Sequence, residues 1–305
     1  MGKEIGMGHY TRMSAVGDVF RLMGYQVNIM TSEDEPIAYD TYDIVVLDSY
    51  QLSDEYIAGI NKQSTLVVCY DDNALYDYDC HMVFNGNLHA ENLKFRINEK
   101  LTTLYLGGQY TPLREMFWNM KPIKIRDKAK NIFVCFGGSD SNDYTPYVIN
   151  AIKEILDVNI HVVLGSHTKC DESVYKIVEK QTSNQISVFK NPSEIVTIMQ
   201  ACDIAITGAG SMVYELATQG IPSVLIPQAD NQEEIASYLN ENKLMTVLEM
   251  WNRVQADDIK NSVMTLISDR YKRVEQSKRL QQTVNKTGAK KIVQEVLTTY
   301  HDYFG

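Results

Sequence analysis

The chain has 305 residues, 44% of them hydrophobic and 22% charged, which is the composition of an ordinary globular protein long enough for two α/β domains. Its 29 Lys and Arg against 39 Asp and Glu give a net charge of −10, so we do not expect nucleic acid as a partner. No apolar run reaches the roughly 18–20 residues of a membrane span, and no apolar signal core follows the first residue. We therefore expect a cytoplasmic protein with no membrane partner.

The first predicted element is a helix entered through the glycine-rich turn Gly6-Met7-Gly8. Apolar spacing predicts that this helix runs from His9 to about Met23. The dipole at a helix start favours a neutral, basic imidazole, and in a cleft such a ring can take a proton from water. A capping or packing histidine is the alternative interpretation. Arg12, one turn later, would either hold a phosphate or pair with a carboxylate.

Polar side chains follow two of the strands predicted in the first half. Those strands are Tyr25–Met30, Asp43–Asp48, Thr65–Tyr70, His81–Asn85 and Thr103–Leu106. Asp48 and Tyr50 lie at the end of one strand, and Asp71 and Asp72 at the end of the next. Carboxylates there can orient a histidine or bind sugar hydroxyls, and helix capping is the alternative. No His, Asp and Glu cluster has metal-ligand spacing, so we expect neither a metal nor a cofactor. A loop and a Pro-led helix are expected over 106–117.

The second half follows a basic, polar linker over 121–130. Its predicted strands are Asn131–Phe136, Asn159–Leu164, Ile186–Phe189, Asp203–Thr207 and Ser223–Pro227. Strands that alternate with amphipathic stretches indicate parallel sheets, and parallel sheets bind ligands at their carboxyl ends. We therefore predict an α/β protein with two Rossmann-like, doubly wound domains facing a cleft, over residues 1–125 and 126–285. Residues 286–305 are predicted to form a helix that packs back on the first domain.

The strip from Asp203 to Gln232 carries the most specific signal in the chain. A buried-looking strand is followed by Gly208-Ala209-Gly210-Ser211, where two glycines allow a close approach and Ser211 is a predicted N-cap. Free N–H groups at such a helix start bind anions. Glu215, one turn on, offers a carboxylate to the hydroxyls of a ribose. Asn231 and Gln232 end the strip, and Ser139, after the turn Gly137-Gly138, is a further phosphate ligand by position; ordinary turn glycines are the alternative.

In chain order these segments resemble one family, the GT-B-like UDP-2,4-diacetamido-2,4,6-trideoxy-β-L-altropyranose hydrolases of pseudaminic acid biosynthesis. The resemblance covers nearly the whole chain, through Ile5–His9 with Arg12, Val46–Tyr50, Asp71-Asp72, Gly108–Tyr110 with Leu113, Arg114 and Phe117, Phe136–Asp140, Gly208–Glu215 and Ala229–Gln232. The second half is also similar to the lipid-linked N-acetylglucosaminyl transferase of peptidoglycan synthesis, which has the GT-B fold. Family members begin with a strand ahead of the Gly-x-Gly-His loop, so we expect the first domain here to lack its N-terminal strand.

The resemblance implies a metal-independent attack of water on the anomeric carbon of a UDP-sugar, with His9 as the general base and UDP leaving with inversion. It implies no cofactor and a UDP-sugar as the partner, and we expect a monomer. The implied substrate-binding residues are Gly8, Arg12, Asp48, Tyr50, Asp72, Ser139, Gly208, Ala209, Gly210, Ser211, Glu215, Asn231 and Gln232. A GT-B glycosyltransferase with an acceptor other than water, and a non-catalytic nucleotide-sugar binding protein, are the alternatives.

Overall fold

A computed structural model describes residues 8–30, 42–60, 62, 65–180 and 185–305. The chain divides into two compact units. Unit 1 comprises Met1–Trp118 together with Asn285–Gly305, and unit 2 comprises Asn119–Val284. The chain passes from one unit to the other after Trp118 and again before Asn285, close to the domain boundaries predicted after residues 125 and 285. No helix within the described ranges is long and apolar enough to cross a bilayer.

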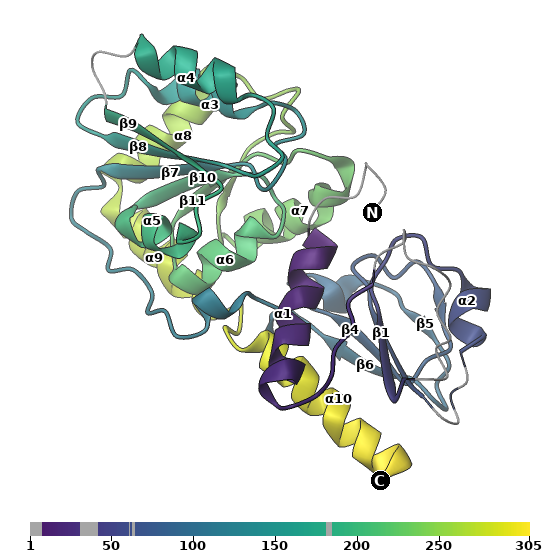
Figure 1. The fold of residues 1–305 in the computed structure, drawn as a ribbon. Coiled ribbons are helices and arrows are strands. Elements are labelled where there is room, and N and C mark those ends of the chain that lie inside the picture. Colours follow the sequence, from purple (N-terminus) through teal and green to yellow (C-terminus); the bar gives the residue numbers. More distant parts are fainter. Residues whose placement is uncertain (1–7, 31–41, 61, 63–64, 181–184) are drawn as a thin grey trace. The chain divides into compact units, whose positions relative to one another are not determined.

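Unit 1 is built on a four-stranded parallel sheet with the order β1-β2-β4-β6 (Figure 1). Its helices are α1 (Gly8–Leu22), α2 (Asp54–Ala58) and α10 (Gly288–Phe304). Its strands are β1 (Ile44–Leu47), β2 (Leu66–Tyr70), β3 (Asp77–Tyr78), β4 (Met82–Asn85), β5 (Arg96–Ile97) and β6 (Thr103–Leu106), with β3 and β5 forming a separate pair. Short 3-10 turns are η2 (Ala90–Asn92), η3 (Gly108–Tyr110) and η4 (Glu115–Phe117).

Each face of this sheet has its own apolar core because successive strand residues point to opposite sides. Leu66 and Val68 of β2 face α1 and α10, where they meet Phe20 and Ile292. Val67 and its neighbours on the other face pack in the cluster that contains Ile57 of α2. All residues of β2 and β4 are buried, which is why both read as continuous apolar runs.

The C-terminal helix α10 packs against α1, although most of the chain separates them. Gly288, its first residue, lies so close to the backbone of Thr111 that no side chain fits there. The backbone N–H of Asn285 donates to the carbonyl of Gly108, and the ammonium of Lys290 lies 4.4 Å from the ring centre of Trp118. Backbone contact and apolar burial thus both hold this helix in unit 1.

Two local predictions in the first half are wrong. Tyr25–Met30 is extended chain and not a strand, and Val27 and Ile29 lie close to Gly17 of α1. The Pro-led helix expected up to Phe117 is only the single turn η4. The helix expected from His9 to about Met23 is confirmed as α1. The turn residues Gly6 and Met7, and any strand ahead of them, lie outside the described residues.

Unit 2 has a six-stranded parallel sheet with the order β12-β11-β10-β7-β8-β9. The strands are β7 (Asn131–Cys135), β8 (Asn159–Leu164), β9 (Gln185–Lys190), β10 (Ile204–Thr207), β11 (Ser223–Leu225) and β12 (Thr246–Val247). The helices are α3 (Thr145–Ile152), α4 (Asp171–Glu179), α5 (Ile195–Ala201), α6 (Met212–Gln219), α7 (Glu233–Glu241), α8 (Ala256–Ser268) and α9 (Arg270–Leu280). One 3-10 turn, η5 (Asp230–Gln232), precedes α7.

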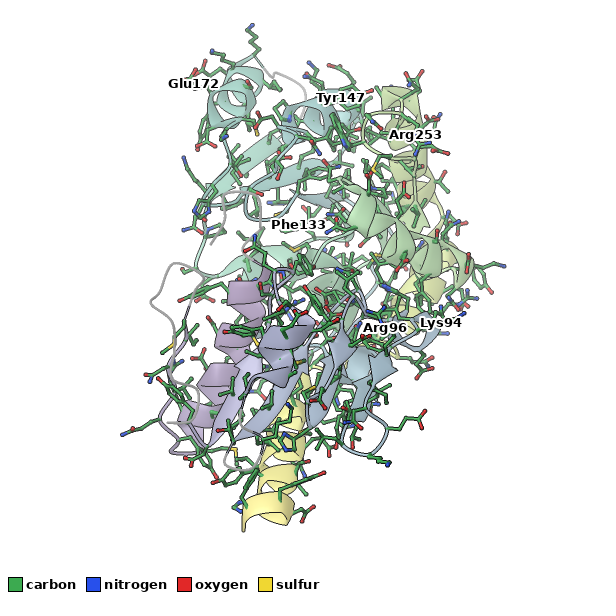
Figure 2. All side chains as sticks on the ribbon, turned by 90° about the vertical axis from the view of Figure 1, so that its right-hand side faces the viewer. Lys94, Arg96, Phe133, Tyr147, Glu172 and Arg253 are labelled. Atoms are coloured by element: carbon green, nitrogen blue, oxygen red, sulfur yellow. The ribbon has the colours of Figure 1, made fainter. Side chains whose placement is uncertain are left out.

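Helices cover both faces of this sheet, with α3, α4 and α8 on one side and α5, α6 and α9 on the other (Figure 1). The five strands predicted in the second half are confirmed. Phe133 of β7 lies inside these layers, fully buried, whereas Glu172 and Arg253 lie on the outside (Figure 2). Such a sheet, buried on both faces, presents only its strand ends and the loops after them to a ligand.

Buried Arg273 ties the linker into unit 2. Its guanidinium donates to the carbonyl oxygens of Leu266 and Ile267 at the end of α8, and to those of Arg126 and Asp127 in the linker. The side chain is 1% exposed. An arginine in this position satisfies backbone groups that burial would otherwise leave without partners.

Candidate active site

The polar network of unit 1 begins with a contact between His9 and Asp48. His9 lies in the first turn of α1, and Asp48 directly follows β1 at the carboxyl end of the sheet. Nδ1 of the imidazole is 2.5 Å from Oδ1 of Asp48, whose side chain is only 2% exposed. A carboxylate can only accept, so Nδ1 carries the proton of this hydrogen bond. The lone pair of a neutral His9 is therefore on Nε2, the nitrogen a base would use.

Arg12 lies one turn after His9 and binds two carboxylates at once. Its Nε donates to Oδ2 of Asp48 at 2.6 Å and its Nη2 to Oδ1 at 2.5 Å. Its Nη1 donates to Oδ2 of Asp72 at 2.5 Å. The guanidinium carbon is 4.6 Å from the ring centre of Tyr70. Phosphate binding and carboxylate pairing were the two roles predicted for Arg12, and its contacts with Asp48 and Asp72 are those of carboxylate pairing.

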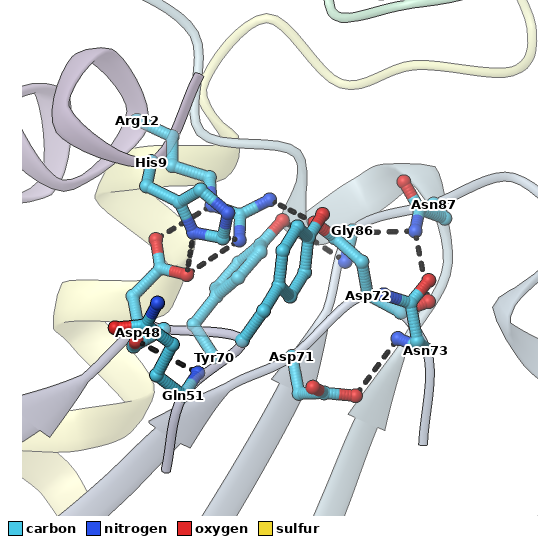
Figure 3. A network of polar contacts seen from close by, with 12 residues as sticks. His9, Arg12, Asp48, Gln51, Tyr70, Asp71, Asp72, Asn73, Gly86 and Asn87 are labelled. Carbon is cyan, nitrogen blue, oxygen red and sulfur yellow. Dashed lines mark hydrogen bonds and ion pairs between the residues drawn. The ribbon is translucent and has the colours of Figure 1, made fainter. Parts of the chain in front are cut away.

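Asp72 collects three donors from three parts of unit 1. Besides Arg12, it accepts from the hydroxyl of Tyr50 at 2.9 Å and from Nδ2 of Asn87 at 3.2 Å. Asn87 follows β4, the neighbour of β2 in the sheet. Figure 3 shows the result, with His9, Arg12 and Asp48 on one side of the cluster and Asp72 and Asn87 on the other. The ring of Tyr50 meets that of His9 edge to face, with 4.3 Å between their centres.

Burial and charge act against each other on these groups. Burial opposes ionisation of Asp48, but hydrogen bonds from Arg12 and His9 outweigh it and hold the pKa of that carboxyl below its ordinary value. Burial, reinforced by the charge of Asp72, raises the pKa of the Tyr50 phenol, so Tyr50 is a neutral donor. Burial also raises the pKa of the neighbouring Asp71, whose Oδ2 accepts from the backbone N–H groups of Asn73 and Ala74. Asp71 is therefore a turn residue, separate from the network around Arg12.

In unit 2 the loops after three adjacent strands are joined by neutral amides. Oε1 of Gln232 accepts from the backbone N–H of Ala209, after β10, at 3.0 Å and from that of Gln228, after β11, at 2.9 Å. Nδ2 of Asn142, in the loop after β7, donates to the carbonyl of Gln228 at 2.9 Å. These contacts hold the carboxyl-terminal loops of β7, β10 and β11 together.

The glycine-rich loops of unit 2 differ in part from the expectation. Ser211 occupies the predicted N-cap position of α6, but it has helical backbone angles, its side chain makes no capping hydrogen bond, and the residue is exposed. Gln232 already binds the N–H of Ala209. A side chain at Gly165, after β8, would collide with the backbone of Gly138 in the turn after β7. Glycine there serves backbone packing.

The predicted site residues thus fall into two groups. His9, Arg12, Asp48, Tyr50 and Asp72 form one connected network in unit 1, and Gly8 precedes it at the start of α1. The residues at the strand ends of unit 2 are Ser139, Gly208, Ala209, Gly210, Ser211, Asn231 and Gln232, with Glu215 buried in α6 behind them. Three residues of these networks were not predicted from the sequence, although their positions after strands were a signal for them: Asn87, Asn142 and Gln228. Within the described ranges no three His, Cys, Asp or Glu side chains form a metal site.

Two curated relatives are similar to the chain over about three quarters of its length. An uncharacterized protein of Methanocaldococcus jannaschii is 24% identical over 265 residues, 76% of this chain and 55% of that protein. The "Pseudaminic acid cytidylyltransferase and UDP-2,4-diacetamido-2,4,6-trideoxy-beta-L-altropyranose hydrolase" of Helicobacter pylori is 25% identical over 235 residues, 74% of this chain and 43% of that protein. The chain therefore spans about half the length of these relatives.

The fold has a solved counterpart in MurG of Acinetobacter baumannii, with a TM-score of 0.67 at 15% identity over 95% of this chain and 96% of that one. The predicted GT-B architecture is confirmed, with two Rossmann-like units on parallel sheets. The model of the Glycosyltransferase family 28 C-terminal domain matches residues 131–296, from β7 into α10. Because this match spans more than half of the chain, the protein belongs to the family of the glycosyltransferase family 28 C-terminal domain.

Proposed function

We propose that this protein hydrolyses a UDP-linked 2,4-diacetamido-trideoxy sugar to the free sugar and UDP, for pseudaminic or other nonulosonic acid biosynthesis. The observation that carries the proposal is the 2.5 Å contact between Nδ1 of His9 and Asp48, which leaves Nε2 as the proton acceptor. Water loses a proton to Nε2 as its oxygen attacks the anomeric carbon. The bond from that carbon to the β-phosphate oxygen breaks, UDP leaves as an anion, and the configuration inverts.

The base requires its supporting carboxylate. A proton gained at Nε2 makes His9 an imidazolium, and the ionised Asp48 on the opposite side of the ring stabilises that charge. UDP needs no protonation to leave, so one base is enough and a metal is not required by the chemistry. Well-placed general bases contribute about 10²–10⁴ in rate.

We assign the UDP part of the substrate to the loops of unit 2. The start of α6 at Gly208–Ser211 is suited to the diphosphate because the helix dipole favours an anion there, with Ala209 held in place by the hydrogen bond of its N–H to Gln232. In this proposal Glu215 binds the ribose, and Ser139, Asn231 and Gln232 bind diphosphate or sugar oxygens. Support comes from the Helicobacter pylori relative, whose name includes the hydrolysis of this UDP-sugar.

The proposal is tested by incubating the protein with UDP-sugars, including the diacetamido altrose derivative, with no acceptor added. We expect release of UDP and free sugar, and loss of that release in His9→Ala while UDP binding persists. Equal release by His9→Ala would overturn the role of the base. UDP binding without release from any UDP-sugar would instead support a non-catalytic binding protein.

A glycosyltransferase is the second candidate, and the family to which this chain belongs favours that candidate. The same His9 would then deprotonate an acceptor hydroxyl in place of water. The two candidates differ in one measurement, which is the dependence of UDP release on an added acceptor. Release that begins only when an acceptor is supplied, with a new glycoside as the product, would select the transferase.

A further inference from the structure

The positive charge of Arg12 would weaken His9 as a base if no negative charge balanced it. Its Nη2 is 3.0 Å from Nδ1 of His9, and since Nδ1 already donates to Asp48, this close approach brings two proton-bearing nitrogens together. A positive guanidinium opposes protonation of the nearby imidazole. Through its two hydrogen bonds to Asp48, it also neutralises part of the negative charge that would stabilise an imidazolium. A negative charge on the other side of Arg12 would offset this influence.

Asp72 supplies the offset. It accepts Nη1, the one guanidinium nitrogen that Asp48 does not bind, at 2.5 Å. Asp48 and Asp72 therefore share one arginine from opposite sides, and the three groups together carry one net negative charge. Both carboxylates are shielded from water, with side-chain exposures of 2% and 14%, so solvent screens their charges weakly.

We propose that Asp72 is a positioning residue for His9: by holding Nη1 of Arg12, it leaves the charge of Asp48 to the imidazole and fixes which ring nitrogen carries the proton. Asn87 supports this role, because its Nδ2 donates both to Oδ1 of Asp72 and to the backbone carbonyl of the same residue. Tyr50 orients the other oxygen and packs against the ring of His9. Among the described residues, the charged and titratable groups that face His9 are thus Asp48, Arg12 and Tyr50, with Asp72 and Tyr70 behind Arg12.

The inference rests on the proposed function only for its kinetic arm. In Asp72→Asn the shape remains and the negative charge is lost, so the full charge of Arg12 acts on Asp48 and His9. We expect the NMR titration of the His9 imidazole, followed on protein labelled with ¹⁵N-histidine, to differ from that of the wild type in the direction of lower pH. His9→Ala assigns the His9 signals among the six histidines of the chain.

The kinetic arm measures UDP release from the substrate against pH. We expect the acid limb of the kcat profile of Asp72→Asn to move to lower pH, with a plateau about tenfold lower because the base is weaker, and an unchanged KM. A purely structural role would lower kcat at every pH without moving the limb. Asn87→Ala should shift the limb in the same direction by less, and Asp72→Glu should restore it in part.

Asp71→Asn is the matched control, since Asp71 is the adjacent carboxyl and its hydrogen bonds go to the backbone of its own turn and to Tyr78 of β3, not to Arg12 or His9. We expect no change in the His9 titration in that variant. An unchanged His9 titration in Asp72→Asn would overturn the inference, even if the wild type hydrolyses UDP-sugars. A shifted titration in a protein that releases no UDP would keep the inference and reject the proposed function.

Discussion

The two sheets of this protein end in polar groups of different kinds. In unit 1 the groups at the carboxyl end are ionisable and bind one another, as Asp48 and Asp72 do through Arg12. In unit 2 they are backbone amides and neutral side chains, of which Gln232 and Asn142 are the connectors. Charged groups in mutual contact can store and move a proton, whereas neutral amides present fixed dipoles to an anion. In the proposed function, the groups of unit 1 move the proton and those of unit 2 bind the diphosphate.

The largest effect that this comparison predicts is the loss of turnover in Asp48→Asn. An asparagine can donate to Nδ1 of His9, which moves the ring proton to Nε2 and removes the base. We expect kcat for UDP release to fall by roughly 10²–10⁴. UDP affinity, measured by calorimetry, should stay unchanged because the proposed function assigns the nucleotide to unit 2. A parallel loss of UDP affinity would contradict the proposal that unit 2 binds UDP while unit 1 supplies the base.

The second prediction concerns the stability of unit 2. Arg273→Ala leaves four backbone carbonyls without their donor, and we expect a loss of about 2–4 kcal/mol in the free energy of unfolding. The chain has two tryptophans, Trp118 in unit 1 and Trp251 in unit 2. In a Trp118→Phe background, tryptophan fluorescence during urea unfolding therefore reports on unit 2 alone, and Arg273→Ala is measured in that background.

Arg270→Ala is its control, because Arg270 is an exposed residue paired with exposed Asp127. Exposed pairs contribute less than about 1 kcal/mol, so this variant should unfold nearly as the wild type does. Equal losses in the two variants would show that the contacts of Arg273 with the linker and α8 do not stabilise unit 2.

The third prediction tests the neutral connectors. Gln232→Ala removes the acceptor shared by the N–H groups of Ala209 and Gln228, so both loops lose their fixed positions. We expect the Kd for UDP to rise about tenfold, which corresponds to about 1.4 kcal/mol, with little change in kcat at saturation. Gln282→Ala, an exposed glutamine of the same unit, should leave the Kd as it is. A fall in kcat alone would contradict the assignment of unit 2 to binding.

The smallest effect is a difference in acid sensitivity. The folded state holds the pKa of Asp48 below its unfolded value, so this group stabilises unit 1 above pH of about 4 and that contribution is lost as the pH falls through the folded value. In a Trp251→Phe background, the fluorescence of Trp118 reports on the unfolding of unit 1. We expect the free energy of unfolding to fall less steeply with decreasing pH when Asp48→Asn is added to that background. Identical slopes with and without Asp48→Asn would show that the ion pairs of Asp48 contribute nothing measurable.

Much of the fold and part of the site were predictable from local patterns. The apolar runs of β2, β7 and β10 are buried on both faces, and such runs are readable because each residue meets the same surroundings. His9, Asp48 and Asp72 were predicted from their places at a helix start and at strand ends, and parallel strands bring those ends together. Tyr25–Met30 misled the prediction because alternating apolar residues serve equally to pack on a helix.

By itself, the sequence determined the α/β fold class and the positions of the candidate site residues along the chain, since strand and helix periodicity, strand-end carboxylates and glycine-rich turns are local properties. The tertiary structure decided the use of each polar group, because that depends on which side chains meet across long stretches of sequence. Arg12 binds two carboxylates, Gln232 occupies the N–H of Ala209, and Asn87 joins the network of Asp72. Hydrogen bonds act over about 3 Å, so only the assembled sheet determines which donors reach which acceptors.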